Sequence, residues 1–427
     1  MKKIYFNLLF LLGLAPSVYS QSLSSIEKKI IATARQNQPE TEKFLEKTVN
    51  INSGTLNLAG VRENGNLLAA EFEKLGFKTD WVSLPDSLNR AGHLVATRQG
   101  KRGKKLFLIG HLDTVFEKSL PFEPFTRVND STATGQGAND IKGGNVLILA
   151  ALKALHTHGL LDDVSITAYF TGDEESSGGS ESRRDFIERA KKCDIALAFE
   201  GAQGLTHVTT GRRGSSSWTL KVVSRTGHSS RVFSDLGYGA IFETARILNE
   251  FRRVLGQEQY LTFNPGLIVG GSDIKYDEKT AKAETSGKTN IVAPLTMVKG
   301  DLRFISEKQK ESARARMREI VEKSLPITKA TITFQDGIPA MEPSEKNENL
   351  RRIVDQVSRD MGIGPVQSGD PGSRGAGDVS FVAEFLPCLD GLGASGKGAH
   401  SIEESINLKE YPVLIQRAAV LLYRLTR

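Results

Sequence analysis

The sequence predicts an α/β protein in which a mixed, largely parallel sheet, covered by helices, is interrupted by a small α+β domain. Strand and helix patterns alternate from about residue 22 to residue 212, which is typical of a parallel sheet with helices on both faces. The order then changes to β-α-β-β-α-β, the order of a compact two-layer unit. Alternation resumes near residue 347, and a chain of 427 residues is long enough for two domains.

The first part of the chain contains three apolar runs that predict buried strands, at 104–110, 164–170 and 194–200. A long helix is expected between the first two strands, over 142–159, because its apolar residues recur every three or four positions. A second helix is expected over 181–192. These elements predict strands that run side by side in one sheet.

The middle part, residues 213–337, is expected to form the inserted domain, with helices over 239–255 and 307–325. The last part, 338–427, is expected to contain a helix near its start and another at its end. Residues 21–212 and 338–427 are therefore predicted to form one discontinuous domain. The strands of the inserted domain are predicted at 218–224, 260–271, 290–304 and 330–334.

Residues 1–20 are predicted to be a secretory signal peptide. Two lysines precede an apolar run, and Val18 and Ser20 fit the small-residue positions of a cleavage site. The run is too short to span a membrane, so the mature chain is expected to be exported, periplasmic or secreted, without a membrane anchor. Cys193 and Cys388 lie far apart at the starts of apolar runs, where buried free thiols are expected, although a disulfide between them stays open.

The net charge gives no sign of a nucleic-acid partner. The formal charge is +6 at pH 7 and falls to about +4 when the two lysines of the signal are removed. The remaining basic residues form no long block, so binding to nucleic acid or to a membrane surface is not expected.

Acidic and imidazole side chains follow successive predicted strands or occupy glycine-rich loops. In an open α/β sheet, ligands bind at the carboxyl ends of the strands, so these side chains are expected to lie close together. The glycine-rich loop at 134–145 lacks the GK[ST] sequence of a phosphate-binding loop. The side chains concerned are His111, Asp113, Asp140, Asp173, Glu174, Glu175, Glu200 and His400.

Taken singly, these residues have simpler explanations. Asp140 could cap a helix, Glu200 could lie at the surface, and Glu174 and Glu175 could form a solvated acidic turn. Together they would form a negatively charged cluster that a metal ion stabilises. Imidazole and carboxylate ligands without a thiolate favour Zn²⁺, Mn²⁺ or Co²⁺ over Mg²⁺ or Ca²⁺. So many ligands suggest two ions, roughly 3.5–4 Å apart.

Five ordered segments resemble the motif set of the zinc aminoacylase and glutamate carboxypeptidase family. That family also includes acetylornithine deacetylase, succinyl-diaminopimelate desuccinylase and several dipeptidases. The resemblance covers nearly the whole mature chain, is closest to the periplasmic glutamate carboxypeptidases, and implies a catalytic domain with an inserted lid and dimerisation domain. The segments are 110-GHLDTV-115, 135-GQGANDIKGG-144, 172-GDEESSG-178, 199-FEG-201 and 398-GAH-400.

The resemblance implies two zinc ions per subunit, with Co²⁺ or Mn²⁺ as possible substitutes. Asp140 would bridge the two ions. His111 and Glu200 would complete one site, and Glu175 and His400 the other.

Further roles follow from the same resemblance. Glu174 would be the general base, and Asp113 would accept the imidazole N–H of His111 and fix its tautomer. The peptide bond between Asp140 and Ile141 is expected to be cis.

In the inserted domain, the resemblance implies that His228 polarises the substrate carbonyl. In dimeric members of the family this histidine comes from the partner subunit. Asn290 and Arg303 would hold the free carboxylate of the substrate, although Arg303 could instead pair with Asp301. Glutamate carboxypeptidases tend to have a lysine soon after the residue equivalent to Glu200, and this chain has none there.

The expected function is therefore that of a homodimeric dizinc metallohydrolase that cleaves an amide bond next to a free amino-acid carboxylate. It would be a carboxypeptidase that releases a C-terminal amino acid such as glutamate from a small peptide. An N-acyl-amino-acid deacylase or a dipeptidase of the same family is the nearest alternative. A catalytically silent binding protein with this fold is a further alternative, against which the complete ligand set and Glu174 argue.

Overall fold

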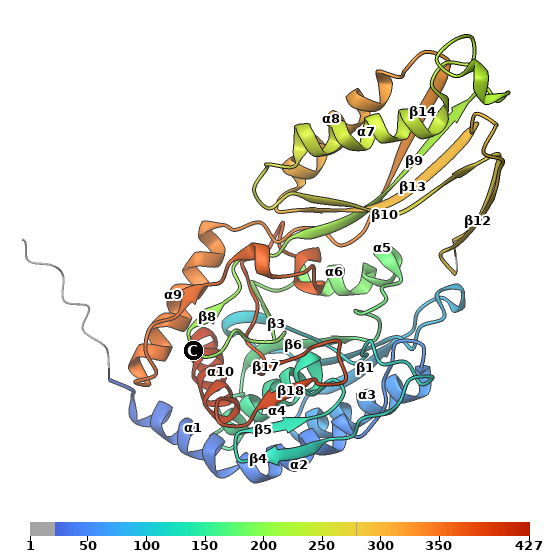
Figure 1. Cartoon of the computed structure of the whole chain (residues 1–427). Helices are drawn as coiled ribbons and strands as arrows, with labels where there is room; N and C mark the ends of the chain where they lie inside the picture. The colour runs from blue at the N-terminus through green and yellow to red at the C-terminus, as the bar shows by residue number, and fades with distance from the viewer. Residues whose placement is uncertain (1–21, 279) are drawn as a thin grey trace, which may run out of the picture.

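The computed structural model describes residues 22–278 and 280–427, so the predicted signal peptide lies outside the described residues. Figure 1 shows a broad lower body and an elongated upper body that projects from it. Within the described residues, no helix is both long and apolar enough to cross a lipid bilayer.

The lower body is built on a six-stranded mixed sheet, as predicted. The strands lie in the order β1-β2-β6-β3-β7-β16. Strands β6, β3, β7 and β16 run parallel to one another, whereas β2 is antiparallel both to β6 and to the edge strand β1. Their bounds are Lys78–Val82 for β1, His93–Arg98 for β2, Val164–Thr171 for β6, Arg102–His111 for β3, Ile195–Ala198 for β7 and Cys388–Leu389 for β16.

Both faces of this sheet are covered because its strands carry apolar residues on both sides. Leu106 and Leu108 of β3 belong to a core shared with most of the helices, whereas Phe107 and Ile109 pack in a second core with Phe186. The helices of the lower body are α1 (Ser25–Gln36), α2 (Gln38–Val49), α3 (Leu58–Lys74), α4 (Gly143–His156), α5 (Gly179–Ser182), α6 (Arg184–Ala190), α9 (Glu345–Asp360) and α10 (Tyr411–Thr426).

Short strands tie distant loops of the lower body together. The small sheet β17-β18-β5-β4 joins the segment before α4 to the segment that carries His400. A two-stranded sheet pairs β15 with β8. The bounds are Thr126–Asn129 for β4, Thr132–Thr134 for β5, His207–Val208 for β8, Gln367–Ser368 for β15, Gly396–Lys397 for β17 and Ser405–Asn407 for β18.

The upper body has the predicted order β-α-β-β-α-β and an apolar core of its own around Trp218 and Phe251. Its strands form an antiparallel sheet in the order β10-β13-β9-β14, with α7 and α8 packed on one face. The exact boundaries of the inserted domain stay a prediction. The elements are β9 (Gly214–Ser224), α7 (Gly239–Leu255), β10 (Thr262–Gly271), β13 (Leu295–Phe304), α8 (Glu307–Glu322) and β14 (Thr328–Asp336).

The sequence did not predict a hairpin formed by β11 (Asp273–Asp277) and β12 (Lys282–Ser286). Its residues are mostly polar and alternate between exposed and half-buried positions, so no apolar run marked it.

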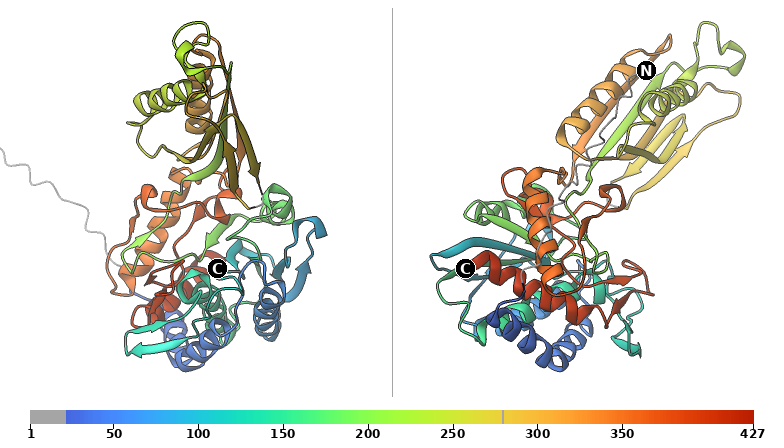
Figure 2. Two further views of the ribbon diagram at one scale, coloured as in Figure 1. Left: turned by 45° about the vertical axis from the view of Figure 1, so that its right-hand side comes forward. Right: turned by 90° about the vertical axis from the view of Figure 1, so that its left-hand side faces the viewer.

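The chain passes between the two bodies twice, and the two crossings are hydrogen-bonded to each other. Arg212 and Met341 exchange backbone hydrogen bonds of 2.9 and 3.0 Å, and the N–H of Ser215 donates to the carbonyl of Ile338 at 2.8 Å. The second view in Figure 2 shows the narrow connection between the bodies.

Arg183 is a buried cation whose removal should destabilise the lower body. Its Nη1 lies 2.5 Å from Asp173 Oδ1, and its Nε lies 2.7 Å from Asp378 Oδ1. Arg183→Met would leave both carboxylates buried and uncompensated, so we expect a loss of about 3–5 kcal/mol in the free energy of unfolding. Urea denaturation followed by circular dichroism measures this loss.

The neighbouring Arg184 is exposed and provides a matched control. Arg184→Met should change the free energy of unfolding by no more than about 0.5 kcal/mol. Equal effects of the two substitutions would contradict a structural role for the buried cation.

Candidate metal centre

The candidate ligands come from five separate segments that meet at the carboxyl edge of the main sheet. His111 is the last residue of β3, and Glu175 and Glu200 follow β6 and β7. Asp140 lies in the turn that leads into α4, and His400 lies between β17 and β18. The structure thus brings together all five residues that the sequence proposes as metal ligands.

Asp140 lies between the two histidines and contacts each with a different oxygen. Its Oδ1 is 3.3 Å from Nε2 of His111, and its Oδ2 is 3.2 Å from Nε2 of His400. Nε2 of His111 is also 3.6 Å from Oε1 of Glu200, and Nε2 of His400 is 3.2 Å from Oε2 of Glu175. The result is two sets of one imidazole and two carboxylates that share Asp140.

The donor atoms in each set are close enough to bind one cation. In the sets His111, Asp140, Glu200 and Asp140, Glu175, His400, the ligand atoms lie within 4.8 Å of one another. Oε1 of Glu175 is buried without a hydrogen-bond partner among the described residues. Nitrogen and carboxylate donors suit a borderline-hard divalent ion such as zinc, so these residues fit the predicted metal.

Burial and charge crowding shift the pKa values at this edge. Burial raises the pKa of Glu200 to about 8 and holds that of Glu174 well above its usual range. Hydrogen bonds to Asp140 and Glu175 raise the pKa of His400 to about 11. The carboxylates are therefore costly to keep ionised here unless positive charge lies next to them.

Asp113 connects the first histidine to the adjacent glutamates. Its Oδ1 accepts the backbone N–H of Glu174 at 3.0 Å, and its Oδ2 accepts that of Glu175 at 3.1 Å. Nδ1 of His111 is 3.0 Å from the backbone oxygen of Asp113 and 3.4 Å from its carboxylate. Asp113 therefore orients the imidazole chiefly through its carbonyl, while its carboxylate fixes the loop that carries both glutamates.

Glu404 is a positioning residue that the sequence analysis missed. Its Oε2 accepts the N–H of Gly137 at 3.0 Å, and its Oε1 accepts the N–H groups of Asn139 and Asp140 at 2.8 Å each. The peptide bond between Asp140 and Ile141 is cis, as predicted. Glu404 thus holds the turn that presents Asp140 and ties it to the segment of His400.

Arg212, which the sequence analysis also missed, is a buried cation whose charge favours the ionised form of Glu200. Its Nη1 lies 2.5 Å from Asp390 Oδ2, and its other nitrogens donate to the carbonyls of Gly375 and Ala376 at 2.7 and 2.8 Å. The sequence offered no signal for this role because these partners lie more than 160 residues along the chain.

The three candidate residues of the inserted domain do not gather at the cluster in one subunit. His228 and Asn290 are neighbours, since the N–H of Ser229 donates to the carbonyl of Asn290 at 2.9 Å. They lie after the end of β9 and before the start of β13, at the end of the small sheet opposite the connection to the lower body. Arg303 is at the opposite end of β13, roughly 26 Å away along eight residues of strand, and its Nε is 2.8 Å from Asp301 Oδ2.

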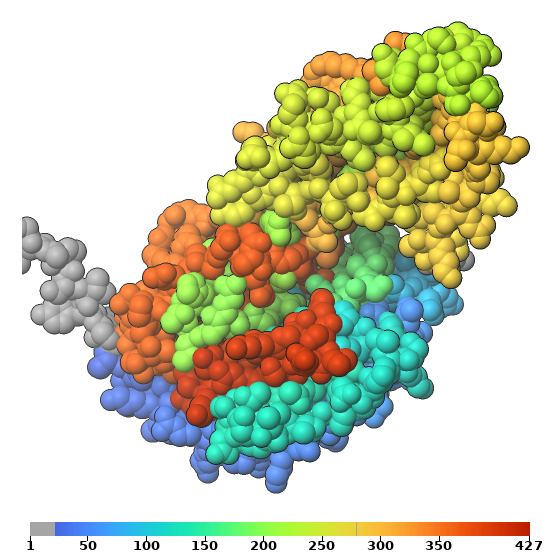
Figure 3. All heavy atoms as spheres, viewed as in Figure 1, coloured from blue at the N-terminus to red at the C-terminus, as the bar shows by residue number. Residues whose placement is uncertain are grey.

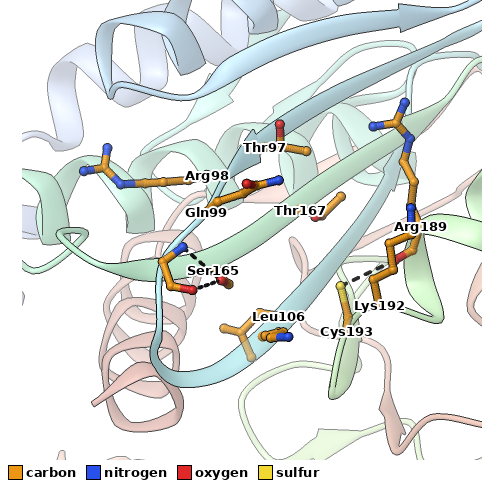
Figure 4. Close-up of a pocket in the computed structure, with 11 residues that line it drawn as sticks. Thr97, Arg98, Gln99, Leu106, Ser165, Thr167, Arg189, Lys192 and Cys193 are labelled. Atoms are coloured by element: carbon orange, nitrogen blue, oxygen red, sulfur yellow. Dashed lines mark hydrogen bonds between the residues drawn. The ribbon is translucent and has the colours of Figure 1, made fainter.

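A separate hollow lies at the opposite edge of the main sheet, near the starts of β3 and β6. It has a volume of about 340 Å³ and is lined in part by Lys105, Ser165 and Cys193 (Figure 4). Both cysteines are free, and burial raises the pKa of Cys193 to about 11, which makes the thiol unreactive. None of the candidate ligands lines this hollow.

Comparisons with known proteins agree with this arrangement. The family model described as peptidase family M20/M25/M40 matches residues 107–424. Carboxypeptidase G2 of Pseudomonas sp. (strain RS-16) is 29% identical over 399 residues, which are 92% of this chain and 91% of that protein.

Two solved structures show the same fold. Aminopeptidase PepT from Bacillus cereus ATCC 10987 has a TM-score of 0.74 and 16% identity, and the match covers 92% of this chain and 99% of that one. A Bacillus subtilis protein described as a dinuclear metal binding peptidase has a TM-score of 0.65 and 11% identity, with coverage of 92% and 99%.

The contacts of Glu404 predict an effect on metal affinity. Glu404→Gln replaces one acceptor oxygen by an NH₂ group, which should disturb the turn of Asp140 and weaken zinc binding by about 10- to 100-fold. Competition with a chromogenic chelator measures the affinity.

Glu403 is exposed and serves as the control, because Glu403→Gln keeps the charge change and removes none of these contacts. If both variants bind zinc as tightly as the unaltered protein, Glu404 does not position Asp140.

Proposed function

We propose that this chain, which belongs to peptidase family M20/M25/M40, is a dizinc enzyme that hydrolyses an amide bond next to a free amino-acid carboxylate. Membership confirms the resemblance inferred from the motifs and makes the chain a hydrolase of peptides or acyl amino acids. The observation that carries the dizinc proposal is Asp140, which lies between two sets of ligands.

In this proposal His111 and Glu200 hold one ion, Glu175 and His400 hold the other, and Asp140 is shared. Divalent cations bound there would polarise a carbonyl and make a water molecule more acidic. Alanine at Asp140 would remove the shared ligand and should lower the bound metal count of the purified protein.

Glu174 is the proposed general base. A carboxylate oxygen of Glu174 lies within 4.8 Å of ligand atoms of His111 and Glu175. The side chain is therefore at the same edge of the sheet as the candidate ligands. The carboxylate of Asp113 accepts the backbone N–H of Glu174 and so fixes the backbone position from which the Glu174 side chain extends. In this role Glu174 would accept the proton of the attacking water and return it to the leaving amine.

The free carboxylate of the substrate is proposed to bind Arg303 and Asn290. The side chain of Arg303 is partly exposed at 38%, and a guanidinium that uses Nε for Asp301 keeps its two terminal NH₂ groups for a second acid. The distance between Arg303 and Asn290 means that one subunit cannot supply both to one site in the observed arrangement.

We therefore propose a homodimer in which each site takes His228 and Asn290 from the partner. Supporting this, Phe233, Tyr238 and Phe242 form an exposed aromatic cluster beside the loop of His228. Such a cluster is typical of an interface.

The released amino acid is proposed to be acidic, such as glutamate, by analogy with carboxypeptidase G2. A deacylase or dipeptidase activity is the alternative, because the segment 200–214 directly after β7 contains no lysine. A panel of N-acyl amino acids and dipeptides separates these activities. Export to the periplasm or the medium is part of the same proposal.

Glu174→Gln tests the general base, because the amide cannot accept the proton. We expect the rate of turnover to fall by about 10²- to 10⁴-fold while the zinc content stays the same. Turnover is measured with the best substrate of the panel, and zinc by atomic emission. Near-normal turnover in this variant would contradict the role of Glu174 as general base.

Mixed dimers test the shared site. Glu174→Gln and His228→Ala subunits should each be nearly inactive alone, but a mixed dimer would contain one site with an intact Glu174 and the partner's intact His228. After dissociation and reassembly of equal amounts, we expect recovery of about one quarter of the normal activity. No recovery, despite mixed dimers on native mass spectrometry, would mean that His228 acts within its own subunit or not at all.

A further inference from the structure

A mainly apolar hollow lies beside His400. It has a volume of about 410 Å³ and opens to solvent next to the metal cluster. Two of its side chains are unusually exposed for their type, Leu120 at 50% and Ile402 at 70%. The hollow is lined by Val115, Phe116, Leu120, Pro121, Gln136, His400, Ser401 and Ile402.

The two walls of the hollow belong to segments that carry candidate metal ligands. One wall follows His111 and its strand, and the other contains His400. In Figure 3 the red segment near residue 400 lies against the teal segment of the first wall. Gln136 is held to the first wall, since its Nε2 donates to the carbonyl of Pro121 at 2.8 Å. The N–H of the preceding Gly135 donates to the carbonyl of Glu404 at 3.1 Å, which connects this segment to the second wall.

The chemistry of the lining selects an apolar occupant. Burial of the leucine, isoleucine, valine, phenylalanine and proline side chains against hydrocarbon lowers the free energy. A contiguous exposed apolar patch often marks a binding site.

We propose that this hollow is the subsite for the acyl side of the scissile amide, and that the enzyme prefers substrates with an apolar acyl group or an apolar residue there. The inference rests on the proposed amide hydrolysis. The connection is His400, which both lines the hollow and contacts Asp140 and Glu175. A carbonyl at the cluster would therefore have its apolar substituent directed to Leu120 and Ile402, while the amino acid to be released binds elsewhere.

The test compares N-acetyl, N-butanoyl and N-hexanoyl derivatives of one amino acid with the zinc-loaded protein. Each buried methylene can raise kcat/KM by up to about fourfold, so hexanoyl should exceed acetyl by at least about tenfold. In Leu120→Asn and Ile402→Asn variants the hexanoyl-to-acetyl ratio should fall by at least about fivefold. Both residues are exposed, so these changes should not prevent folding.

Val128→Asn is the matched control, because Val128 is exposed on β4 and does not line the hollow. It should leave the ratio unchanged. A ratio near one in the unaltered protein, or an unchanged ratio in both Leu120 and Ile402 variants, would overturn the subsite while leaving the hydrolase proposal intact.

If no derivative is hydrolysed, the deacylase alternative fails and binding decides the subsite separately. Calorimetry on the zinc-loaded Glu174→Gln protein then compares the dissociation constants of the acetyl and hexanoyl derivatives. Hexanoyl binding at least fivefold tighter than acetyl would support the subsite, and equal binding would overturn it.

Discussion

The structure depends on one constraint, which is the crowding of carboxylates at the carboxyl edge of a buried sheet. Asp140, Glu174, Glu175 and Glu200 meet there, and burial together with mutual repulsion raises the pKa values of the three glutamates. Two imidazoles lie between them, and Asp140 lies between the imidazoles. Positive charge, whether protons on the histidines or bound cations, is therefore what allows these segments to converge.

Much of the surrounding structure serves to hold the crowded groups in position. Asp113 accepts the two amides of the adjacent glutamates, and Glu404 accepts three amides of the turn that presents Asp140. Arg212 and Arg183 bring buried positive charges to neighbouring acids. These contacts link segments that are distant in sequence, so the ligand geometry is a property of the whole lower body.

The sequence predicted the ligand set well because strand ends meet at one edge of an α/β sheet, whatever the loops between them do. From the residues alone the pair Glu174 and Glu175 could form a solvated turn, and the family resemblance gave them separate roles. In the structure both backbone N–H groups donate to Asp113, and both side chains have an oxygen within 4.8 Å of a ring nitrogen of His111. Glu404 escaped notice because its partners are more than 260 residues away, and nothing near it in the sequence marks it as buried.

The inserted domain shows the limit of the same reasoning. Its elements were predicted in the correct order, apart from a polar hairpin without an apolar pattern. The predicted strand 290–304 already placed Asn290 and Arg303 near opposite ends, but the family roles gave both residues to one substrate carboxylate. His228 and Asn290 lie at one end of the small sheet and Arg303 at the other, and the proposed homodimer would bring the two ends to one site.

The most direct test of the central claim is anomalous X-ray scattering at the zinc edge from crystals of the zinc-loaded protein. The account predicts two peaks, roughly 3.5–4 Å apart, with Asp140 between them. One should lie beside His111 and Glu200, and the other beside Glu175 and His400. A single peak, or two peaks that do not share Asp140, would contradict it.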